Sequence, residues 1–346
     1  MNHPTEQIGT PVSDIPRLKS PRFEVHPEVS SARIAQVLGA DDNRSAIVLG
    51  DAIAMLRAMP DASVQTAITS PPYWSLRDYG IEQQVGLEAS VYDFIGHLAD
   101  IFDEVRRVLR DDGTLWLNIG DSYTSGGRDR RAPDRKNSAR EMSTRPPTPE
   151  GLKPKDLIGV PWRLAFELQD RGWYLRSDII WNKPNCQPES VRDRPTRSHE
   201  YVFLLSKSER YKYDVDAITG PNGRRLRSVW DIKTQAVPEA RGHFATYPTA
   251  IVEPAVMLST ERGDVVLDPF IGSGTTALVA GNLGRRFIGS ELNPEYVEIA
   301  RARLVQNGFR DDDAPATEGD SDDAATHPAA DAGSAAVRAR DTRRRA

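Results

Sequence analysis

A proline-rich aromatic segment lies near the front of the chain, at residues 69–74 (TSPPYW). Its two prolines fix the φ angles and keep the segment stiff. Tyr73 and Trp74 can present an aromatic face, on which a planar base extruded from a duplex can stack. The Ser70 hydroxyl and the main-chain carbonyl of Pro71 can accept hydrogen bonds from an amino group held against that face. These residue types suit chemistry on the exocyclic amine of a nucleobase.

An exocyclic amine on cytosine or adenine is a poor nucleophile, because its lone pair is delocalised into the ring. When it attacks a methyl sulfonium, the nitrogen becomes tetrahedral and cationic. Acceptors placed on its N–H bonds stabilise this developing charge more than they stabilise the ground state. The remaining work is the in-line positioning of amine, methyl group and sulfur, so no covalent enzyme intermediate is needed.

A glycine-rich turn follows much later in the chain, at residues 268–275 (DPFIGSGT). Gly272 and Gly274 allow a tight turn and a close approach to a ligand, and the N-terminus of the helix that follows favours an anionic group. Glu291 ends the next apolar run, where an acidic residue can accept both hydroxyls of a ribose. A nicotinamide dehydrogenase normally shows Gly-x-Gly-x-x-Gly without a preceding Asp-Pro-Phe, so an adenosyl cofactor is the favoured ligand.

Short apolar runs alternate with segments of helical spacing through the middle of the chain, and this alternation predicts the elements that position both motifs. Strands are expected at 46–49, 67–69, 114–119, 175–181, 200–206, 265–267 and 286–291. Helices are expected at 91–109, 157–168, 275–283 and 294–304. Strands that alternate with helices predict an α/β fold with a mostly parallel sheet covered on both faces. Both motifs directly follow a strand, so they are expected at the same edge of the sheet.

The two ends of the chain differ in composition from its middle. Residues 1–40 are rich in Pro, Ser and charge, with a weak helical pattern near 31–38, and are expected to be a partly disordered extension. Residues 310–346 are rich in Asp and Ala and then in Arg, so they bury too little apolar surface to offset chain entropy and are expected to be disordered. One folded domain is predicted at 41–309.

Two basic strips interrupt a chain whose net charge is −5. Residues 126–155 contain nine basic and four acidic residues, and residues 183–228 contain ten basic and six acidic residues. Local basic strips are compatible with a phosphate backbone gripped along one cleft. A solvated loop is the alternative for either strip alone.

The composition also limits the class of protein. Apolar residues make up 38% and charged residues 27% of the chain, and Cys186 is the single cysteine, so neither a disulfide framework nor a cysteine cluster for zinc is expected, and no metal site is predicted. No run approaches about 18 consecutive apolar residues, and residues 1–20 lack an apolar signal core. A cytoplasmic location is therefore expected.

Over roughly residues 45–307 the chain resembles the beta group of DNA amino-methyltransferases, in which the base-binding motif precedes the cofactor turn. Besides the two motifs, the similar segments are 50–52 (GDA), 109–116 (LRDDGTLW) with Asp121, 180–185 (IWNKPN), 199–207 (HEYVFLLSK) and 243–248 (HFATYP). The resemblance implies a Rossmann-like methyltransferase fold, with helices on both faces of a mostly parallel central sheet that includes an antiparallel strand pair. It also implies S-adenosylmethionine as the cofactor.

The resemblance also implies roles for individual residues. Asp51 is expected at the adenine amino group of the cofactor, and Glu291 at its ribose. The residues expected to bind the target base are Ser70, Pro71, Pro72 and Tyr73. The remaining residues expected to bind the cofactor are Phe244, Pro248, Asp268, Pro269, Phe270, Gly272, Ser273, Gly274, Thr275 and Asn293. His199 is expected to be structural or to contact DNA, because the amine needs no strong general base before it attacks.

The favoured function is methylation of cytosine N4 in double-stranded DNA, because Ser70 rather than Asp or Asn opens the Pro-Pro-Tyr motif. Adenine N6 is the alternative target. A DNA-binding relative without turnover and a methyltransferase for protein or RNA are less favoured. Methylation at a cytosine ring carbon needs a thiolate, typically in a Pro-Cys pair, whereas Cys186 follows Asn185.

The resemblance leaves target reading and partners less defined. In the family, a variable stretch before the Tyr-Pro segment reads the DNA sequence, and here that stretch, 214–241, is short. The basic strip 126–155 is therefore expected to share the task. A cognate restriction endonuclease is a candidate partner, no membrane partner is expected, and the chain is expected to be a monomer or a homodimer.

Overall fold

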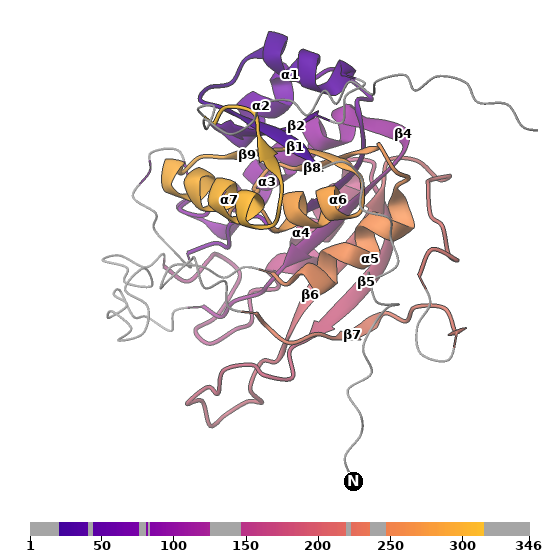
Figure 1. Cartoon of the computed structure of the whole chain (residues 1–346). Coiled ribbons are helices and arrows are strands. Elements are labelled where there is room, and N and C mark those ends of the chain that lie inside the picture. Colours follow the sequence, from indigo (N-terminus) through magenta and orange to yellow (C-terminus); the bar gives the residue numbers. More distant parts are fainter. Residues whose placement is uncertain are drawn as a thin grey trace, which may run out of the picture. The chain divides into compact units, whose positions relative to one another are not determined.

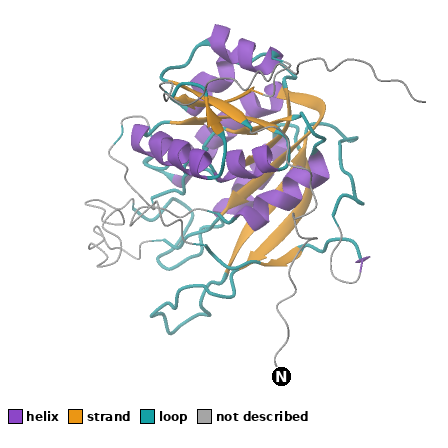
Figure 2. Cartoon of the chain, in the orientation of Figure 1, coloured by secondary structure: helices purple, strands orange, loops and turns teal. Residues whose placement is uncertain are grey.

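The computed structural model describes residues 21–40, 44–75, 81, 84–124, 147–218, 223–235 and 247–314. Within these ranges ten strands form one sheet (Figures 1 and 2). They are β1 (Arg22–His26), β2 (Arg44–Leu49), β3 (Val64–Thr69), β4 (Leu109–Ile119), β5 (Tyr174–Asn182), β6 (His199–Ser206), β7 (Val229–Asp231), β8 (Val265–Asp268), β9 (Arg286–Glu291) and β10 (Arg310–Asp311). Their order across the sheet is β10-β1-β2-β9-β8-β3-β4-β6-β5-β7.

Of the ten described strands, nine run in the same direction and β6 runs opposite to them. β6 pairs antiparallel with both β4 and β5, and β7 pairs parallel with β5. The predicted α/β fold, with a mostly parallel sheet and an antiparallel strand pair, is confirmed.

Helices cover both faces of the sheet, each over its own hydrophobic cluster. The helices are α1 (Ser31–Gly39), α2 (Ala52–Ala58), α3 (Val91–Val108), α4 (Val160–Asp170), α5 (Thr249–Ser259), α6 (Thr275–Asn282) and α7 (Pro294–Gln306). The first four contribute to one cluster, and α5, α6 and α7 lie together over the other (Figure 1). Among the described residues, no helix combines the length and the apolar character needed to cross a membrane.

Helix α3 shows how the sequence pattern produces this packing. Ser90 caps it by accepting a hydrogen bond from the main-chain N–H of Asp93, and its apolar residues recur at helical spacing and are buried on one side. The predicted helix at 91–109 is therefore confirmed to within one residue.

The neighbouring pair β3 and β8 brings the two motifs together. These strands are parallel, with Thr66 opposite Val266 and Ala67 opposite Leu267. From β3 the sheet continues through β4, and from β8 it continues through β9 in the other direction. Such a reversal opens a crevice at the carboxyl ends of the strands, where α/β proteins bind ligands.

The ordered fold extends beyond the predicted limits of 41 and 309. β1 lies inside the residues expected to form the N-terminal extension and pairs with β2, while β10 lies inside the expected tail and pairs with β1. Arg22 and Asp312 also form an ion pair, with Nη2 and Oδ2 3.0 Å apart. Both strands have too few apolar residues for a sequence signal, because their stability depends on pairing with strands distant in the chain.

β4 begins at Leu109, whereas the sequence predicted a helix up to residue 109 and a strand only from 114 to 119. The register against β3 shifts between Val64 and Thr66, which accommodates the extra residues as a bulge. Gly113 suits this bulge, because a Cβ there would lie 2.9 Å from the carbonyl oxygen of Arg110. Asp and Gly residues occur both in bulges and in turns, so the sequence at 111–113 does not distinguish a bulge within β4 from a turn before it.

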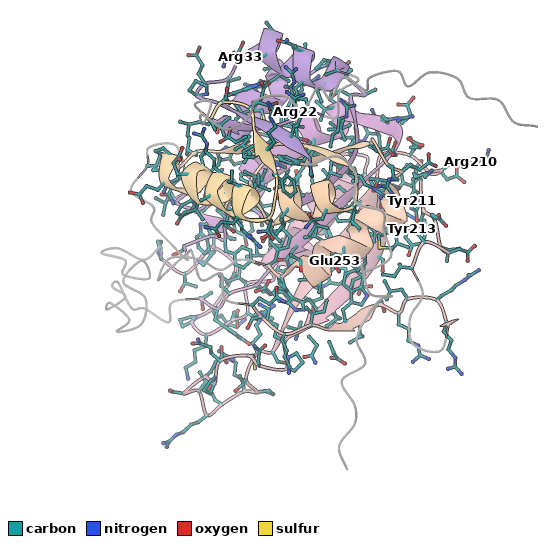
Figure 3. All side chains as sticks on the ribbon, in the orientation of Figure 1. Arg22, Arg33, Arg210, Tyr211, Tyr213 and Glu253 are labelled. Atoms are coloured by element: carbon teal, nitrogen blue, oxygen red, sulfur yellow. The ribbon has the colours of Figure 1, made fainter. Side chains whose placement is uncertain are left out.

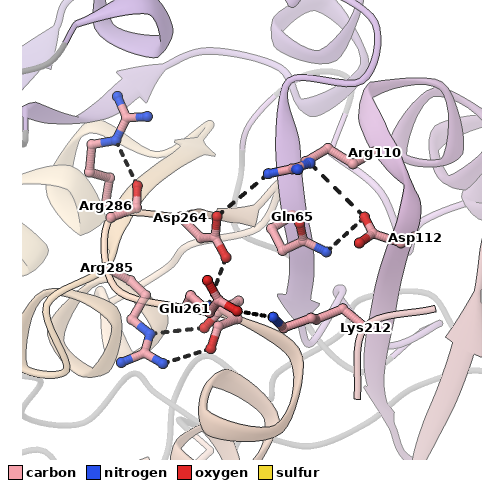
Figure 4. Close-up of polar contacts among 10 residues, drawn as sticks. Gln65, Arg110, Asp112, Lys212, Glu261, Asp264, Arg285 and Arg286 are labelled. Carbon is pink, nitrogen blue, oxygen red and sulfur yellow. Dashed lines mark hydrogen bonds and ion pairs between the residues drawn. The ribbon is translucent and has the colours of Figure 1, made fainter. Parts of the chain in front are cut away.

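A polar network joins the amino ends of the central strands, at the edge opposite the crevice (Figure 4). Arg110 of β4 approaches Asp264 at 3.6 Å, and Arg285 donates to the carbonyl oxygen of Thr260 at 2.7 Å. Beyond β6, Tyr211 and Tyr213 lie edge to face with ring centroids 6.3 Å apart (Figure 3). These contacts fix connections away from the crevice and are assigned to stability.

Candidate active site

A cavity of about 860 Å³ opens at the carboxyl ends of β3 and β8. Such a volume is typical of sites for small molecules and cofactors. The predicted site residues that line it are Asp51, Ser70, Pro71, Pro72, Tyr73, Pro269, Phe270, Gly272, Ser273, Thr275, Glu291 and Asn293. The structure thus places residues from both motifs around one space.

Four predicted site residues are not among those that line the cavity. Pro248, Asp268 and Gly274 are buried behind it, and Phe244 lies outside the described residues. These three residues lie in the structure around the cavity, and their contact with the cofactor stays a prediction.

The cofactor turn has the backbone that its glycines predict. Gly272 and Gly274 have φ of 50° and 77°, in the left-handed region that favours glycine, and Gly274 caps helix α6. Behind the turn, Arg303 of α7 donates to the carbonyl oxygen of Ser273 at 3.1 Å and to Oγ1 of Thr275 at 2.9 Å. Arg303 holds the shape of the turn, a role that the sequence did not reveal.

Glu291 links the turn to the end of β9. One carboxylate oxygen accepts the main-chain N–H of Gly272 at 3.0 Å, and the other accepts that of Asn293 at 2.9 Å. Burial raises the pKa of Glu291 to about 7, although hydrogen bonds from main-chain N–H groups oppose the rise. The cavity therefore contains a desolvated acid that gains from further hydrogen-bond donors.

Asp268 joins the two motifs from within the sheet. Its side chain is 1% exposed, and it accepts hydrogen bonds from Thr69 Oγ1 at 2.6 Å, Thr276 Oγ1 at 2.6 Å, Tyr247 Oη at 3.1 Å and the Phe270 N–H at 3.1 Å. Burial raises its pKa to about 6, against the effect of these donors. Because Thr69 directly precedes Ser70, this carboxyl group ties the proline-rich aromatic segment 69–74, here called the base segment, to the cofactor turn at 268–275.

Tyr73 faces the cavity with its hydroxyl group anchored. The hydroxyl donates to Oε2 of Glu200 at 2.8 Å. Burial raises the pKa of Tyr73 well above its usual value, and Glu200 adds to the rise, whereas hydrogen bonds from the Ser70 side chain and the Gly120 main chain oppose it. The ring therefore has a fixed place beside Ser70.

Comparison with known proteins decides the family. The family model described as a DNA methylase of the N6/N4 type matches residues 64–302, which include the whole base segment and the whole cofactor turn. This chain belongs to the N6/N4 DNA methylase family. The prediction of an S-adenosylmethionine-dependent DNA methyltransferase is confirmed at the level of this family.

Relatives of this methylase match most of its length. The type II methyltransferase M.Cfr9I of Citrobacter freundii is 58% identical over 266 residues, which cover 76% of this chain and 88% of that protein. The type II methyltransferase M.SmaI of Serratia marcescens is 56% identical over 266 residues, which cover 75% of this chain and 90% of that protein.

Solved structures share the fold of this methylase. The PvuII DNA methyltransferase, described as cytosine-N4-specific, is 21% identical with a TM-score of 0.58, and the match covers 85% of this chain and 98% of that one. The modification methylase TTHA0409 of Thermus thermophilus, solved in complex with S-adenosyl-L-methionine, is 24% identical with a TM-score of 0.54, covering 79% of this chain and all of the other. At these identities the likeness shows the fold.

Trp74 does not share the aromatic face that the sequence assigned to it. Its side chain is 6% exposed within a hydrophobic cluster, and its indole N–H donates to the carbonyl oxygen of Glu88 at 3.0 Å. The expectation was wrong for Trp74, because two adjacent aromatic residues point in different directions and the sequence does not show which one is buried. Of the two aromatic residues, Tyr73 alone lines the cavity, and its role as the platform stays a prediction.

His199 and Cys186, which were predicted to have no catalytic role, also line the cavity of this methylase. Burial and the nearby Arg197 guanidinium hold the pKa of His199 below its usual value, so the ring is neutral near pH 7. Cys186 lines the cavity from the loop after β5, where its main-chain N–H donates to the carbonyl oxygen of Lys183.

Sequence reasoning assigned no role to Glu200, Lys183 or Asn118, although all three line the cavity. Glu200 and Lys183 lie in the segments 199–207 and 180–185, which were noted for their resemblance to the family, and both also fall within the basic strip 183–228. The pairing of Trp181 with Glu200 across β5 and β6 brings them together. An acidic and a basic residue at facing strand ends could have suggested a pair, had the register been known.

Proposed function

We propose that this methylase transfers a methyl group from S-adenosylmethionine to N4 of a cytosine flipped out of double-stranded DNA. The observation that supports this choice of base is Ser70, which opens the Pro-Pro-Tyr motif and lines the same cavity as the cofactor turn. The description of the PvuII enzyme as cytosine-N4-specific supports the same base. Adenine N6 is the alternative target.

The residues of the cavity fit the proposed cofactor. Glu291 is a half-buried acid at the end of β9, suited to the two ribose hydroxyls, and Asp51 at the cavity wall suits the adenine amino group. The N-terminus of α6 presents main-chain N–H groups and a partial positive charge, which suit a carboxylate. S-adenosylmethionine supplies an electrophilic methyl group when it is bound there.

The base segment supplies the other half of the chemistry. The Tyr73 ring holds the cytosine in place, while Ser70 Oγ and the Pro71 carbonyl oxygen accept the N–H bonds of its amino group. These acceptors stabilise the positive charge that develops on the nitrogen during an in-line attack. The tie between Thr69 and Asp268 fixes the two motifs relative to each other, which favours alignment of the amine with the methyl group.

Mapping modified bases across the genome of a methylation-free host that expresses this chain tests the choice of base. We expect N4-methylcytosine within one short sequence, and a Ser70→Ala chain provides the matched background. Methylated adenine alone would overturn the choice of base. An unmodified genome would favour a DNA-binding relative without turnover.

We also propose that residues 126–155 and 214–241 read the DNA, within a methyltransferase domain that strands β1 and β10 extend beyond the predicted limits of 41 and 309. Lys155, at the end of the first strip, forms an ion pair at 2.9 Å with Asp193 of the β5–β6 loop. Other residues of this loop line the cavity, so the strip ends close to the proposed base site. The likeness to type II methyltransferases favours a cognate restriction endonuclease as a partner, with this chain as a monomer or a homodimer.

Deleting residues 126–146 tests the first strip. We expect weaker DNA binding and a shallower dependence of log affinity on log salt concentration, because each phosphate contact contributes a slope of about −0.9. Titrations at several salt concentrations measure both, and cofactor affinity serves as the control for folding. Unchanged affinity together with an unchanged slope would remove this strip from the DNA interface.

A further inference from the structure

Glu200 makes a set of contacts in the cavity that the proposed function does not use. It is the second residue of β6, and its side chain is 16% exposed. One carboxylate oxygen, Oε2, accepts the Tyr73 hydroxyl at 2.8 Å and the Asn118 amide at 3.3 Å. The other, Oε1, forms an ion pair with Lys183, whose ammonium group also lies 4.1 Å from the centroid of the Trp181 ring.

The hydrogen bonds around Tyr73 can run in one direction only. A carboxylate accepts hydrogen bonds and donates none, and a tyrosine hydroxyl has a single proton. Tyr73 must therefore donate to Glu200, so its oxygen can only accept from the Ser70 hydroxyl. Once the Ser70 proton is committed to Tyr73, the lone pairs of Ser70 Oγ remain available for the N–H bonds of a target amine.

The ring of Tyr73 is also held from behind. A Cβ at Gly120, which directly follows β4, would lie 2.7 Å from Cε2 of Tyr73 and 3.3 Å from Cδ of Glu200. The ring and the carboxylate thus pack against the bare backbone of Gly120. With Asn118 and Lys183 on the carboxylate, Glu200 has a defined position from which to orient Tyr73.

We propose that Glu200 is a positioning residue for methyl transfer: acting through Tyr73, it fixes the aromatic platform and directs the lone pairs of Ser70 toward the amine. This inference rests on the proposed transfer to an exocyclic amine, and it holds for either target base. It also accounts for a tyrosine rather than a phenylalanine at position 73, since the Tyr73 hydroxyl donates to Glu200 and thereby accepts the proton of Ser70.

Replacing Glu200 by glutamine tests the direction of this chain of hydrogen bonds. Because Lys183 faces one side of the group, the new amide is expected to turn its oxygen to Lys183 and its N–H toward Tyr73. Tyr73 would then donate to Ser70, and the Ser70 proton would point toward the amine. We expect kcat to fall by about ten-fold or more, whereas KM for S-adenosylmethionine and Tm stay close to those of the unaltered protein.

The double variant separates positioning from a structural role. If Glu200 acts through Tyr73, then Glu200→Gln in a Tyr73→Phe background should lower kcat by less than two-fold further. Multiplicative losses would overturn the proposal, as would Glu200→Gln with normal kcat. Glu253→Gln is the matched control and should leave kcat unchanged, because Glu253 lies on α5 (labelled in Figure 3) and is not among the residues that line the cavity.

Measuring turnover on cytosine and adenine targets in parallel keeps the two proposals distinct. A protein that methylates adenine alone would refute the choice of cytosine, while the ratio of variant to unaltered kcat would still decide the role of Glu200. Retained binding of S-adenosylhomocysteine by Glu200→Gln confirms that a lower kcat does not come from a disrupted cavity.

Discussion

Replacing Ser70 by alanine is expected to lower turnover by a factor of about 10² to 10³, the usual effect of removing one group that stabilises transition-state charge. The amine that attacks the methyl group becomes cationic. Ser70 Oγ is the side-chain acceptor in the base segment that can take a hydrogen bond from this amine and so stabilise its positive charge. Because Ser70 and the cofactor turn contribute to different parts of the cavity wall, cofactor affinity should change by less than about two-fold. Single-turnover kinetics and calorimetric titration with S-adenosylmethionine measure the two quantities separately.

Tyr73→Ala should also lower turnover while leaving cofactor affinity nearly unchanged, but for a different physical reason. Its loss removes the face on which the base stacks, an interaction of about 1–3 kcal/mol, so transfer should fall while cofactor binding persists. Ser31→Ala, at the exposed start of α1, is the control and should have normal activity. Lost cofactor binding in both Ser70→Ala and Tyr73→Ala would mean that the base and cofactor halves are assigned to the wrong motifs.

The central elements of the fold were predictable because the pattern of apolar residues within each element indicates which of its faces are buried. Parallel strands covered on both faces need continuous apolar runs, as in β2 and β8, and helices such as α3 need apolar residues at helical spacing. β1, β7 and β10 were not predicted, because strands of two to five residues gain their stability from partners distant in the chain.

The site was predictable where one short segment determines both geometry and chemistry. The turn from Asp268 to Thr275 has two positions with left-handed backbone, and both are glycine, so the sequence of the turn predicts its shape. Glu200 and Arg303 could not be assigned in this way, since the Tyr73–Glu200 and Thr275–Arg303 contacts join residues 127 and 28 positions apart and depend on how β6 and α7 pack. Residue patterns within one segment do not show which distant residues will pair with it.

Asp268→Ala should have the largest effect on stability, with a loss of about 3 kcal/mol or more. The substitution leaves four buried donors without their acceptor: the hydroxyls of Thr69, Thr276 and Tyr247 and the main-chain N–H of Phe270. An unsatisfied buried donor costs about 1–3 kcal/mol, and some of the hydroxyls can turn to other acceptors. Thermal unfolding should shift down by on the order of 5–10 °C, and methyl transfer should be lost with the link between Thr69 and the cofactor turn.

Asp268→Asn is the matched variant that keeps the shape and removes the charge. Its oxygen can accept from Thr69 and Phe270, and its amide can donate to Tyr247 and Thr276, since Thr276 has the carbonyl oxygen of Ile68 as another acceptor at 3.3 Å. We therefore expect a much smaller loss of stability than for Asp268→Ala. Equal losses in the two variants would contradict the assignment of the effect to unsatisfied donors.

The dependence on pH gives the same carboxyl group a second test. Its pKa in the folded protein is about 6, above the ordinary value of 3.8, so the folded state favours the protonated form. The stability that this group contributes is therefore fully present below about pH 4 and is lost as the pH rises through about 6. The stability difference between the unaltered protein and Asp268→Asn should therefore narrow between about pH 4 and pH 6 and stay constant above about pH 7, as measured by urea unfolding at each pH. A constant difference over the lower interval would show that Asp268 is ionised in the folded protein throughout, and that its four donors outweigh its burial.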